Sequence, residues 1–253
     1  GWVNINDDFY FLGSGNFLWQ SERDGYAHLY QFNEDGSLVG QVTKGSWALR
    51  SSGGPFWLRQ SVVNIDEEHS QVYFTSLEKS SIERHLYRIG LDGSGLQRIT
   101  REEGVHKVSF SPDGKYYFDT YSNINTLPAL ALYSRDGERL TVIAEPRPEL
   151  LEELQLQTPE LFTIPTTDGF PMPAQILKPK DFNPGKKYPL IFNIYGGPSA
   201  PTVFNRWQGL SLFFDNMLLN RGYLVVKFDH RSATAISKKL ENRLLKMASG
   251  PRE

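Results

Sequence analysis

The chain has 253 residues, of which 39% are hydrophobic, so it is long enough for one large domain or two small ones with a substantial core. Its net charge of −2 gives no reason to expect a nucleic acid partner, and the absence of cysteine excludes disulfides and thiolate metal sites. No apolar run approaches the roughly 20 residues of a membrane-spanning helix, so we expect no membrane span in this segment. We also expect no metal and no cofactor.

The first residues, Gly1-Trp2, do not show a charged segment followed by an apolar one, so no signal peptide is visible. We interpret this start as a point inside a domain. The compartment is therefore open, and both periplasm and cytoplasm are compatible with the sequence, since many periplasmic proteins also lack cysteine.

A β-rich pattern occurs three times in the first 145 residues or so. Each copy has an apolar strand, a second strand that ends in or near Leu-Tyr, and an Asp-Gly turn. The second strands are at 28–30, 85–87 and 129–133, and the turns are Asp35-Gly36, Asp92-Gly93 and Asp136-Gly137. Asp-Gly between alternating strands is a strong signal for a β-hairpin.

A β unit that recurs at intervals of roughly 45 residues is typical of propeller blades. Propellers usually have about four to eight blades, and this chain holds about three. We therefore predict a partial β-propeller over residues 1–148. A different stack of β units is the alternative.

Histidines and tryptophans in this half carry weak functional signals. The histidines have no metal-like spacing, and two of them occupy equivalent places in two repeats, so we expect structural roles (His28, His69, His85, His106). Aromatic residues in blades usually belong to the core, although they can also line a ligand surface (Trp2, Trp19, Trp47, Trp57).

Residues 149–253 alternate predicted strands and helices. Residues 149–156 form either a short helix or an extended crossover. Strands are then expected at 161–164, 172–178, 190–194 and 224–228, and helices at 207–219 and 236–247. This alternation predicts a parallel α/β sheet, whose ligand sites lie beyond the carboxyl ends of its strands.

The most informative stretch is Lys186–Ala200, with the sequence K-K-Y-P-L-I-F-N-I-Y-G-G-P-S-A. Residues 190–194 are apolar and rich in β-formers, so they predict a buried strand that runs into a sharp loop. Gly196 and Gly197 let the backbone turn and approach a ligand closely. Tyr195 stands between the strand and this loop, where a phenol can donate a hydrogen bond from a fixed position.

A β-repeat half, the K-K-Y-P strand, the Y-G-G-P loop and a later R-G-Y-apolar-D segment together resemble the dipeptidyl peptidase IV branch of the prolyl oligopeptidase family. The resemblance covers essentially the whole chain. It implies a β-propeller over an α/β-hydrolase domain, and a Ser-Asp-His triad that cleaves peptides after a penultimate proline or alanine. It also implies a peptide substrate and leaves a homodimer of the parent enzyme open.

The resemblance gives Tyr195 the role of oxyanion-hole donor. In acyl transfer the carbonyl oxygen gains negative charge, and a preplaced O–H group stabilises it. The related acylaminoacyl-peptidase branch usually has histidine here, so tyrosine favours a dipeptidyl peptidase. Gly196 and Gly197 are implied to shape the substrate-binding loop. Arg206 is a candidate substrate contact, but a surface arginine or one paired with a carboxylate is the favoured interpretation.

The nucleophile elbow G-x-S-x-G occurs nowhere in the 253 residues. We therefore expect residues 149–253 to be the N-terminal part of a hydrolase domain, truncated before the elbow, and the chain alone to be inactive. Asp229, His230 and Ser232 do not make a triad, because neighbours in sequence cannot converge. The family usually has D-x-R-G-S-G at this point, so the local loop departs from it, and we expect Asp229 to pair with Arg231.

Two rival functions remain open. One is a non-catalytic β-propeller module for binding or interaction with an α/β appendage, which needs no nucleophile. The other is a different branch of the prolyl oligopeptidase family, such as an oligopeptidase or an acylaminoacyl-peptidase.

Overall fold

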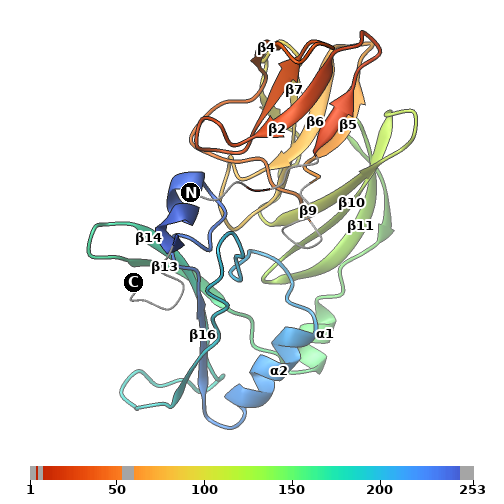
Figure 1. Ribbon diagram of the computed structural model, residues 1–253. Coiled ribbons are helices and arrows are strands. Elements are labelled where there is room, and N and C mark those ends of the chain that lie inside the picture. The colour runs from red at the N-terminus through yellow and green to blue at the C-terminus, as the bar shows by residue number, and fades with distance from the viewer. Residues whose placement is uncertain (1–3, 5–7, 53–59, 246–253) are drawn as a thin grey trace.

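The structure is a computed structural model that describes Asn4 and residues 8–52 and 60–245. Strands dominate these residues, and helices are few and short. Three four-stranded antiparallel sheets come first in the chain, and a fourth, mixed sheet with flanking helices follows (Figure 1). None of the helices in the described part has the length and apolar content that a bilayer crossing requires.

Each of the first three sheets is a simple meander in which neighbours in sequence are neighbours in space. The first contains β1 (Phe9–Phe11), β2 (Phe17–Ser21), β3 (His28–Phe32) and β4 (Leu38–Gln41). The second contains β5 (Val62–Asp66), β6 (Gln71–Ser76), β7 (His85–Gly90) and β8 (Gln97–Arg98). The third contains β9 (Val105–Phe110), β10 (Tyr116–Asn123), β11 (Thr126–Ser134) and β12 (Arg139–Ala144).

The repeat predicted from the sequence recurs in the hydrogen bonds. His28 Nδ1 lies 3.1 Å from Thr43 Oγ1, and in the next sheet His85 Nδ1 lies 3.0 Å from Thr100 Oγ1. The same threonine oxygens accept the backbone N–H of Leu29 and of Leu86. His28 and His85 are both buried, so their role in these sheets is structural, as predicted.

Successive sheets pack on one another through their apolar faces. Leu18 and Leu29 of the first sheet share a core with Phe74 and Tyr87 of the second. Side chains of the second and third sheets meet in a further cluster: Tyr73, Leu86, Ile99 and Tyr117. Trp47 packs against the first core and Trp19 is exposed, whereas Trp2 and Trp57 lie outside the described residues.

The fourth sheet has the order β13-β14-β16-β15, and only β15 and β16 in it run parallel. Its strands are β13 (Glu160–Pro165), β14 (Pro171–Leu177), β15 (Leu190–Phe192) and β16 (Leu224–Phe228). The flanking helices are α1 (Glu149–Glu153), α2 (Leu210–Leu219), α3 (Lys238–Glu241) and the 3-10 helix η1 (Asn242–Leu244). Of the two alternatives for residues 149–156, the structure has the short helix.

Several elements of this half differ from the prediction. The sheet is mixed, because the hairpin of β13 and β14 joins it antiparallel. The strand at 190–194 was predicted to be buried, but Leu190 and Phe192 are exposed because β15 is an edge strand with a neighbour on one side only. The helix predicted at 207–219 begins at Leu210, and the helix predicted at 236–247 is α3 with η1, its last residues lying outside the described part.

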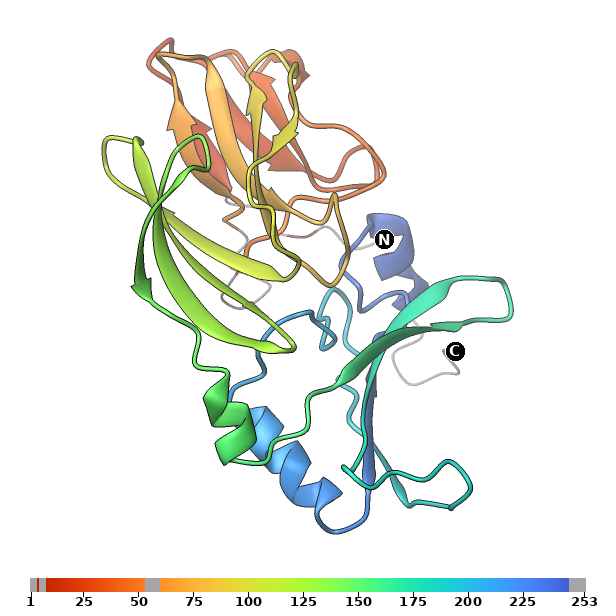
Figure 2. The same ribbon diagram turned by 180° about the vertical axis from the view of Figure 1, so that it is seen from behind.

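The loop before α2 joins the two halves. It lies next to the β10–β11 hairpin in both views (Figure 2). Asn205 donates its backbone N–H to the Ile82 carbonyl at 2.9 Å, and its side chain donates to Glu83 Oε1 at 2.7 Å. Trp207 N donates to Ser122 Oγ at 3.3 Å. These bonds place residues after β15 against the second and third sheets.

Candidate functional site

The two segments singled out from the sequence lie together at one edge of the fourth sheet. Tyr195 follows β15, and Asp229 directly follows β16. Because these two strands are parallel neighbours, their carboxyl ends meet at the same edge, where ligand sites of such sheets are found. The predicted placement of both segments at strand ends is confirmed.

The Tyr195 side chain is 68% exposed, and its hydroxyl has no hydrogen-bond partner among the described residues. Its ring lies against the backbone of Gly197: a Cβ at position 197 would stand 2.5 Å from Tyr195 Cε1. Gly196 has a φ of +73°, which favours glycine. Both glycines are therefore needed for the position of this ring.

A buried carboxylate holds the next part of the loop. Asp229 accepts the backbone N–H of Thr202 and of Val203, and also the Thr202 hydroxyl, at distances of 2.8–2.9 Å. Burial raises the pKa of Asp229, although these bonds oppose the shift. The loop after β15 is thus fastened to the loop after β16.

His230 adds a second link between the same two loops. Its Nε2 lies 3.0 Å from the carbonyl oxygen of Gly196, and its side chain is buried. Ser199 N donates to the carbonyl of Ser232 at 2.8 Å. Asp229, His230 and Ser232 each face a partner in the Tyr195 loop, so the structure supports the view that they are not a catalytic triad.

The prediction that Asp229 and Arg231 pair with each other is wrong. Arg231 instead makes a two-pronged bond to Asp168, at 2.9 Å from Nη1 and 2.6 Å from Nη2. This bond lowers the pKa of Asp168. Asp168 belongs to the turn between β13 and β14, which the sequence places far from residue 231, so nothing in the local pattern pointed to it.

Arg206 lies on the loop before α2, in the direction of the first three sheets. Its side chain is exposed, and its guanidinium carbon stands 4.5 Å from the centre of the Phe204 ring. No carboxylate within the described residues forms an ion pair with it. It is therefore a surface arginine on an aromatic ring rather than one held by a carboxylate.

The sequence did not single out a buried pair in the third sheet. His106 Nδ1 lies 2.6 Å from Asp119 Oδ2, and both side chains are buried. Burial alone would lower the pKa of His106, but the hydrogen bond and charge of Asp119 raise it above its ordinary value. In the pairing of β9 with β10, His106 lies opposite Tyr121 and Asp119 lies opposite Val108, so the two residues are diagonal neighbours that only the strand register reveals.

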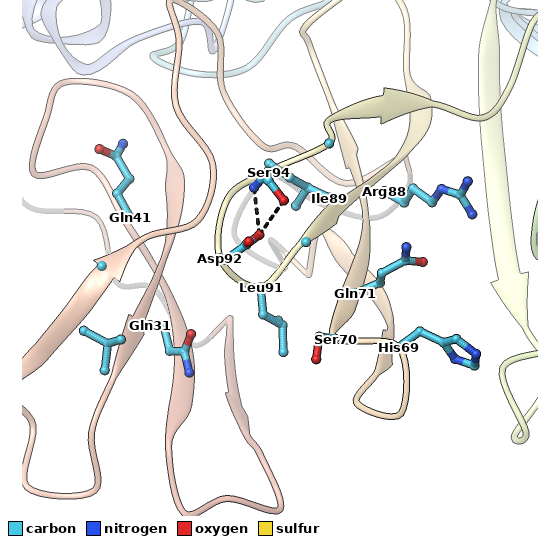
Figure 3. A pocket seen from close by; sticks show the side chains of 14 residues that line it. Gln31, Gln41, His69, Ser70, Gln71, Arg88, Ile89, Leu91, Asp92 and Ser94 are labelled. Atoms are coloured by element: carbon cyan, nitrogen blue, oxygen red, sulfur yellow. Dashed lines mark hydrogen bonds between the residues drawn. The ribbon is translucent and has the colours of Figure 1, made fainter.

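A pocket of about 740 Å³ lies between the first and second sheets (Figure 3). Glutamine side chains line it together with Arg88 and Asp92. Asp92 is already engaged by the backbone N–H and hydroxyl of Ser94, and Arg88 by Gln97 and Asp136. The pocket belongs to β4 and β7, at the end of the molecule away from β16 (Figure 1). It is a groove between sheets, separate from the Tyr195 loop.

Comparison with known proteins gives a consistent result. Residues 1–128 match the family model described as "Dipeptidyl peptidase IV (DPP IV) N-terminal region". The chain is 28% identical to dipeptidyl peptidase 8 of Homo sapiens over 276 residues, covering 95% of this chain and 30% of the relative. It is 33% identical to "Probable dipeptidyl-aminopeptidase B" of Aspergillus clavatus over 224 residues, covering 85% of this chain and 23% of the relative.

A solved structure shows the same similarity. The crystal structure of Porphyromonas gingivalis dipeptidyl peptidase 4 superposes with a TM-score of 0.80 at 26% identity, covering 94% of this chain and 32% of that one. The chain thus spans less than a third of the length of these relatives. Because the family match over residues 1–128 extends through half of its 253 residues, the chain belongs to the dipeptidyl peptidase IV family.

Proposed function

We propose that this chain is part of a serine exopeptidase that releases N-terminal dipeptides of the Xaa-Pro and Xaa-Ala type. Residues 1–148 would be a partial β-propeller of about three blades, one for each antiparallel meander. Residues 149–253 would be the N-terminal part of an α/β-hydrolase domain. The stacked meanders, the parallel pair β15 and β16, and the similarity to dipeptidyl peptidases support this division.

The observation that carries the proposal is the Tyr195 hydroxyl. It is exposed, it is not used by another group in the described structure, and it stands at the carboxyl end of a parallel strand. In acyl transfer such a phenol donates a hydrogen bond to the oxygen of the tetrahedral intermediate. Gly196 and Gly197 would let the substrate backbone pass close to the loop, and Arg206 would contact the substrate from the propeller side.

The chain supplies no nucleophile of the expected kind, since G-x-S-x-G is absent from its sequence. The proposal therefore places the Ser-Asp-His triad on other residues of a longer protein. The 253-residue chain by itself should not hydrolyse a Gly-Pro chromogenic amide, whereas the full-length protein should.

The test is a Tyr195→Phe variant of the full-length protein, assayed with the Gly-Pro reporter. Loss of one oxyanion donor lowers kcat by about 10²–10³-fold with little change in KM. Tyr223→Phe is the matched control, because it removes a phenol hydroxyl from the same half, at the amino-terminal end of β16 and away from the carboxyl ends of the strands. Equal activity of the Tyr195→Phe variant and the unchanged protein would remove the support for the oxyanion role.

A further inference from the structure

Arg84, just before β7, is a buried cation that pairs with no carboxylate in the described part of the chain. Only 5% of its surface is accessible. No Asp or Glu of the described residues forms an ion pair with it. Buried charges in proteins are normally paired, because the cost of removing an ion from water is high. This arginine therefore lacks a counter-charge that the fold would be expected to provide.

Backbone oxygens satisfy part of its guanidinium. Nε donates to the carbonyl of Ser51 at 3.2 Å, and Nη1 donates to the carbonyls of Glu83 at 2.7 Å and Ser81 at 3.3 Å. Nη2 has no hydrogen-bond partner within the described structure. The carbonyls fix the orientation of the group, but they are neutral and leave its charge uncompensated.

A second arginine approaches the same aromatic ring as Arg84. The guanidinium carbon of Arg84 lies 5.4 Å from the centre of the Phe204 ring, and that of Arg206 lies 4.5 Å from it. Arg206 comes from the loop before α2, so the two cations belong to different halves of the molecule. Bonds from Asn205 to Ile82 and Glu83 hold these halves together at this point. Ligand sites often lie at such junctions.

The other charges nearby are already engaged. The Glu83 carboxylate binds His85 Nε2 at 3.1 Å and the Asn205 amide at 2.7 Å. Arg50 lies 3.5 Å from Glu22. Burial, with the added repulsion of Arg50 and Arg206, lowers the pKa of Arg84 to about 9. The group is still charged at neutral pH, and the net local charge is positive.

We propose that Arg84 and Arg206 bind a carboxylate beside the Phe204 ring. Nη2 of Arg84 and the guanidinium N–H groups of Arg206 have no acceptor within the described structure. These donors suit a planar anion with two oxygens. The inference that a carboxylate binds here depends only on the geometry of the two arginines. The further inference that this carboxylate belongs to a bound peptide rests on the proposed function.

The experiment is calorimetric titration of the full-length protein with N-acetylglycylglycine and with its C-terminal amide, at low ionic strength and pH 7. The blocked amino terminus keeps an exopeptidase from processing either peptide. We expect the carboxylate to bind at least about tenfold more tightly than the amide, which corresponds to one charge-assisted hydrogen bond. Inorganic phosphate in a third titration should bind no more tightly than the carboxylate peptide.

Variants assign the effect to the two arginines. Arg206→Gln should weaken binding of the carboxylate about tenfold and leave binding of the amide unchanged. Arg139→Gln, which removes an exposed arginine from β12, is the matched control and should bind as the unchanged protein does. Arg84→Lys keeps the positive charge but removes the planar guanidinium with its paired N–H donors, so it should weaken binding of the carboxylate by a similar factor. Circular dichroism must show that this variant has the native fold.

Three results would overturn the proposal: equal affinity for peptide and amide, the same loss in Arg139→Gln as in Arg206→Gln, or tighter binding of phosphate. If Arg84→Lys does not fold, the titration of Arg206→Gln alone decides whether the proposal holds. Arg206 is exposed, so its replacement should not disturb the fold. None of these titrations depends on turnover, so a failure here is distinct from a failure of the Tyr195→Phe test.

Discussion

At the scale of single residues, one contact decides how Tyr195 is presented. Its ring rests on Gly197, so the space for the phenol exists only because that residue lacks a side chain. The bond from His230 to the Gly196 carbonyl and the bonds of Asp229 to Thr202 and Val203 then hold the loop. The direction of the phenol is therefore set by glycines and by buried polar groups together.

Gly197→Ala tests this in the full-length protein. The new Cβ would stand 2.5 Å from Tyr195 Cε1, so the ring must move. A displacement of about 1 Å at a catalytic group can cost about 10²-fold in rate, and we expect a loss of that order in kcat with the Gly-Pro reporter. Gly40→Ala is the control, since a Cβ there meets nothing within 4 Å. Full activity of Gly197→Ala would show that the ring position is not required.

At the scale of elements, the repeated His and Thr pair explains why two sheets have the same form. In each sheet a threonine after the hairpin turn joins a histidine at the start of the inner strand, and it also accepts a backbone N–H there. The bond thus connects the residues that follow the fourth strand to the start of the third strand, beyond the last backbone hydrogen bonds between these two strands. In the third sheet the buried histidine lies elsewhere: His106, on the first strand β9, binds Asp119 on the second strand β10.

Thr100→Val should therefore destabilise the second sheet. The change keeps the shape of the side chain but leaves Leu86 N and His85 Nδ1 without an acceptor or partner in a buried place. Leaving such groups unsatisfied costs about 1–3 kcal/mol in the free energy of unfolding, which urea titration can measure. Thr141→Val, on the exposed side of β12, should change stability by less than about 0.5 kcal/mol. An equal effect of both variants would contradict the role of the bond.

At the scale of the whole molecule, buried ionisable groups lie along the path from the third sheet to the loop before α2. His106 packs against His85 with 5.2 Å between ring centres, and His85 binds Glu83, which binds Asn205. Of the two histidines, His106 has a raised pKa, so stability should respond to pH where His106 titrates.

The pH dependence follows from His106. Its pKa in the folded protein is above the ordinary 6.5, so the Asp119 interaction contributes fully below pH 6.5 and is lost as pH rises through the folded value. Asp119→Asn should cost about 1.5–3 kcal/mol of unfolding free energy at pH 5.5 and less at pH 8.5. Unfolding of both proteins in urea at the two pH values measures this. A cost in unfolding free energy that stays constant with pH would show that Asp119 does not stabilise the protonated form of His106.

Much of the fold was accessible from local patterns. The strands on either side of the Asp-Gly turns and the repeat follow from apolar β-forming runs and from glycines that adopt a positive φ, such as Gly36 and Gly93, whereas the first strand of each sheet was not predicted. The Tyr195 loop was found in the same way, because Y-G-G-P follows an apolar strand. Its role as a donor is still a prediction.

The sequence by itself determined the repeated hairpins with their Asp-Gly turns, the two strands that lead to Tyr195 and Asp229, and the family resemblance, because these depend on spacing along the chain. Only the tertiary structure decided that β15 is an exposed edge, that Arg231 binds Asp168, and that Arg84 and Arg206 both approach the Phe204 ring. These depend on which distant segments are brought together by packing and strand order. Which distant segments pack together is set by the burial of side chains along the whole chain, so it cannot be predicted from any short stretch of residues.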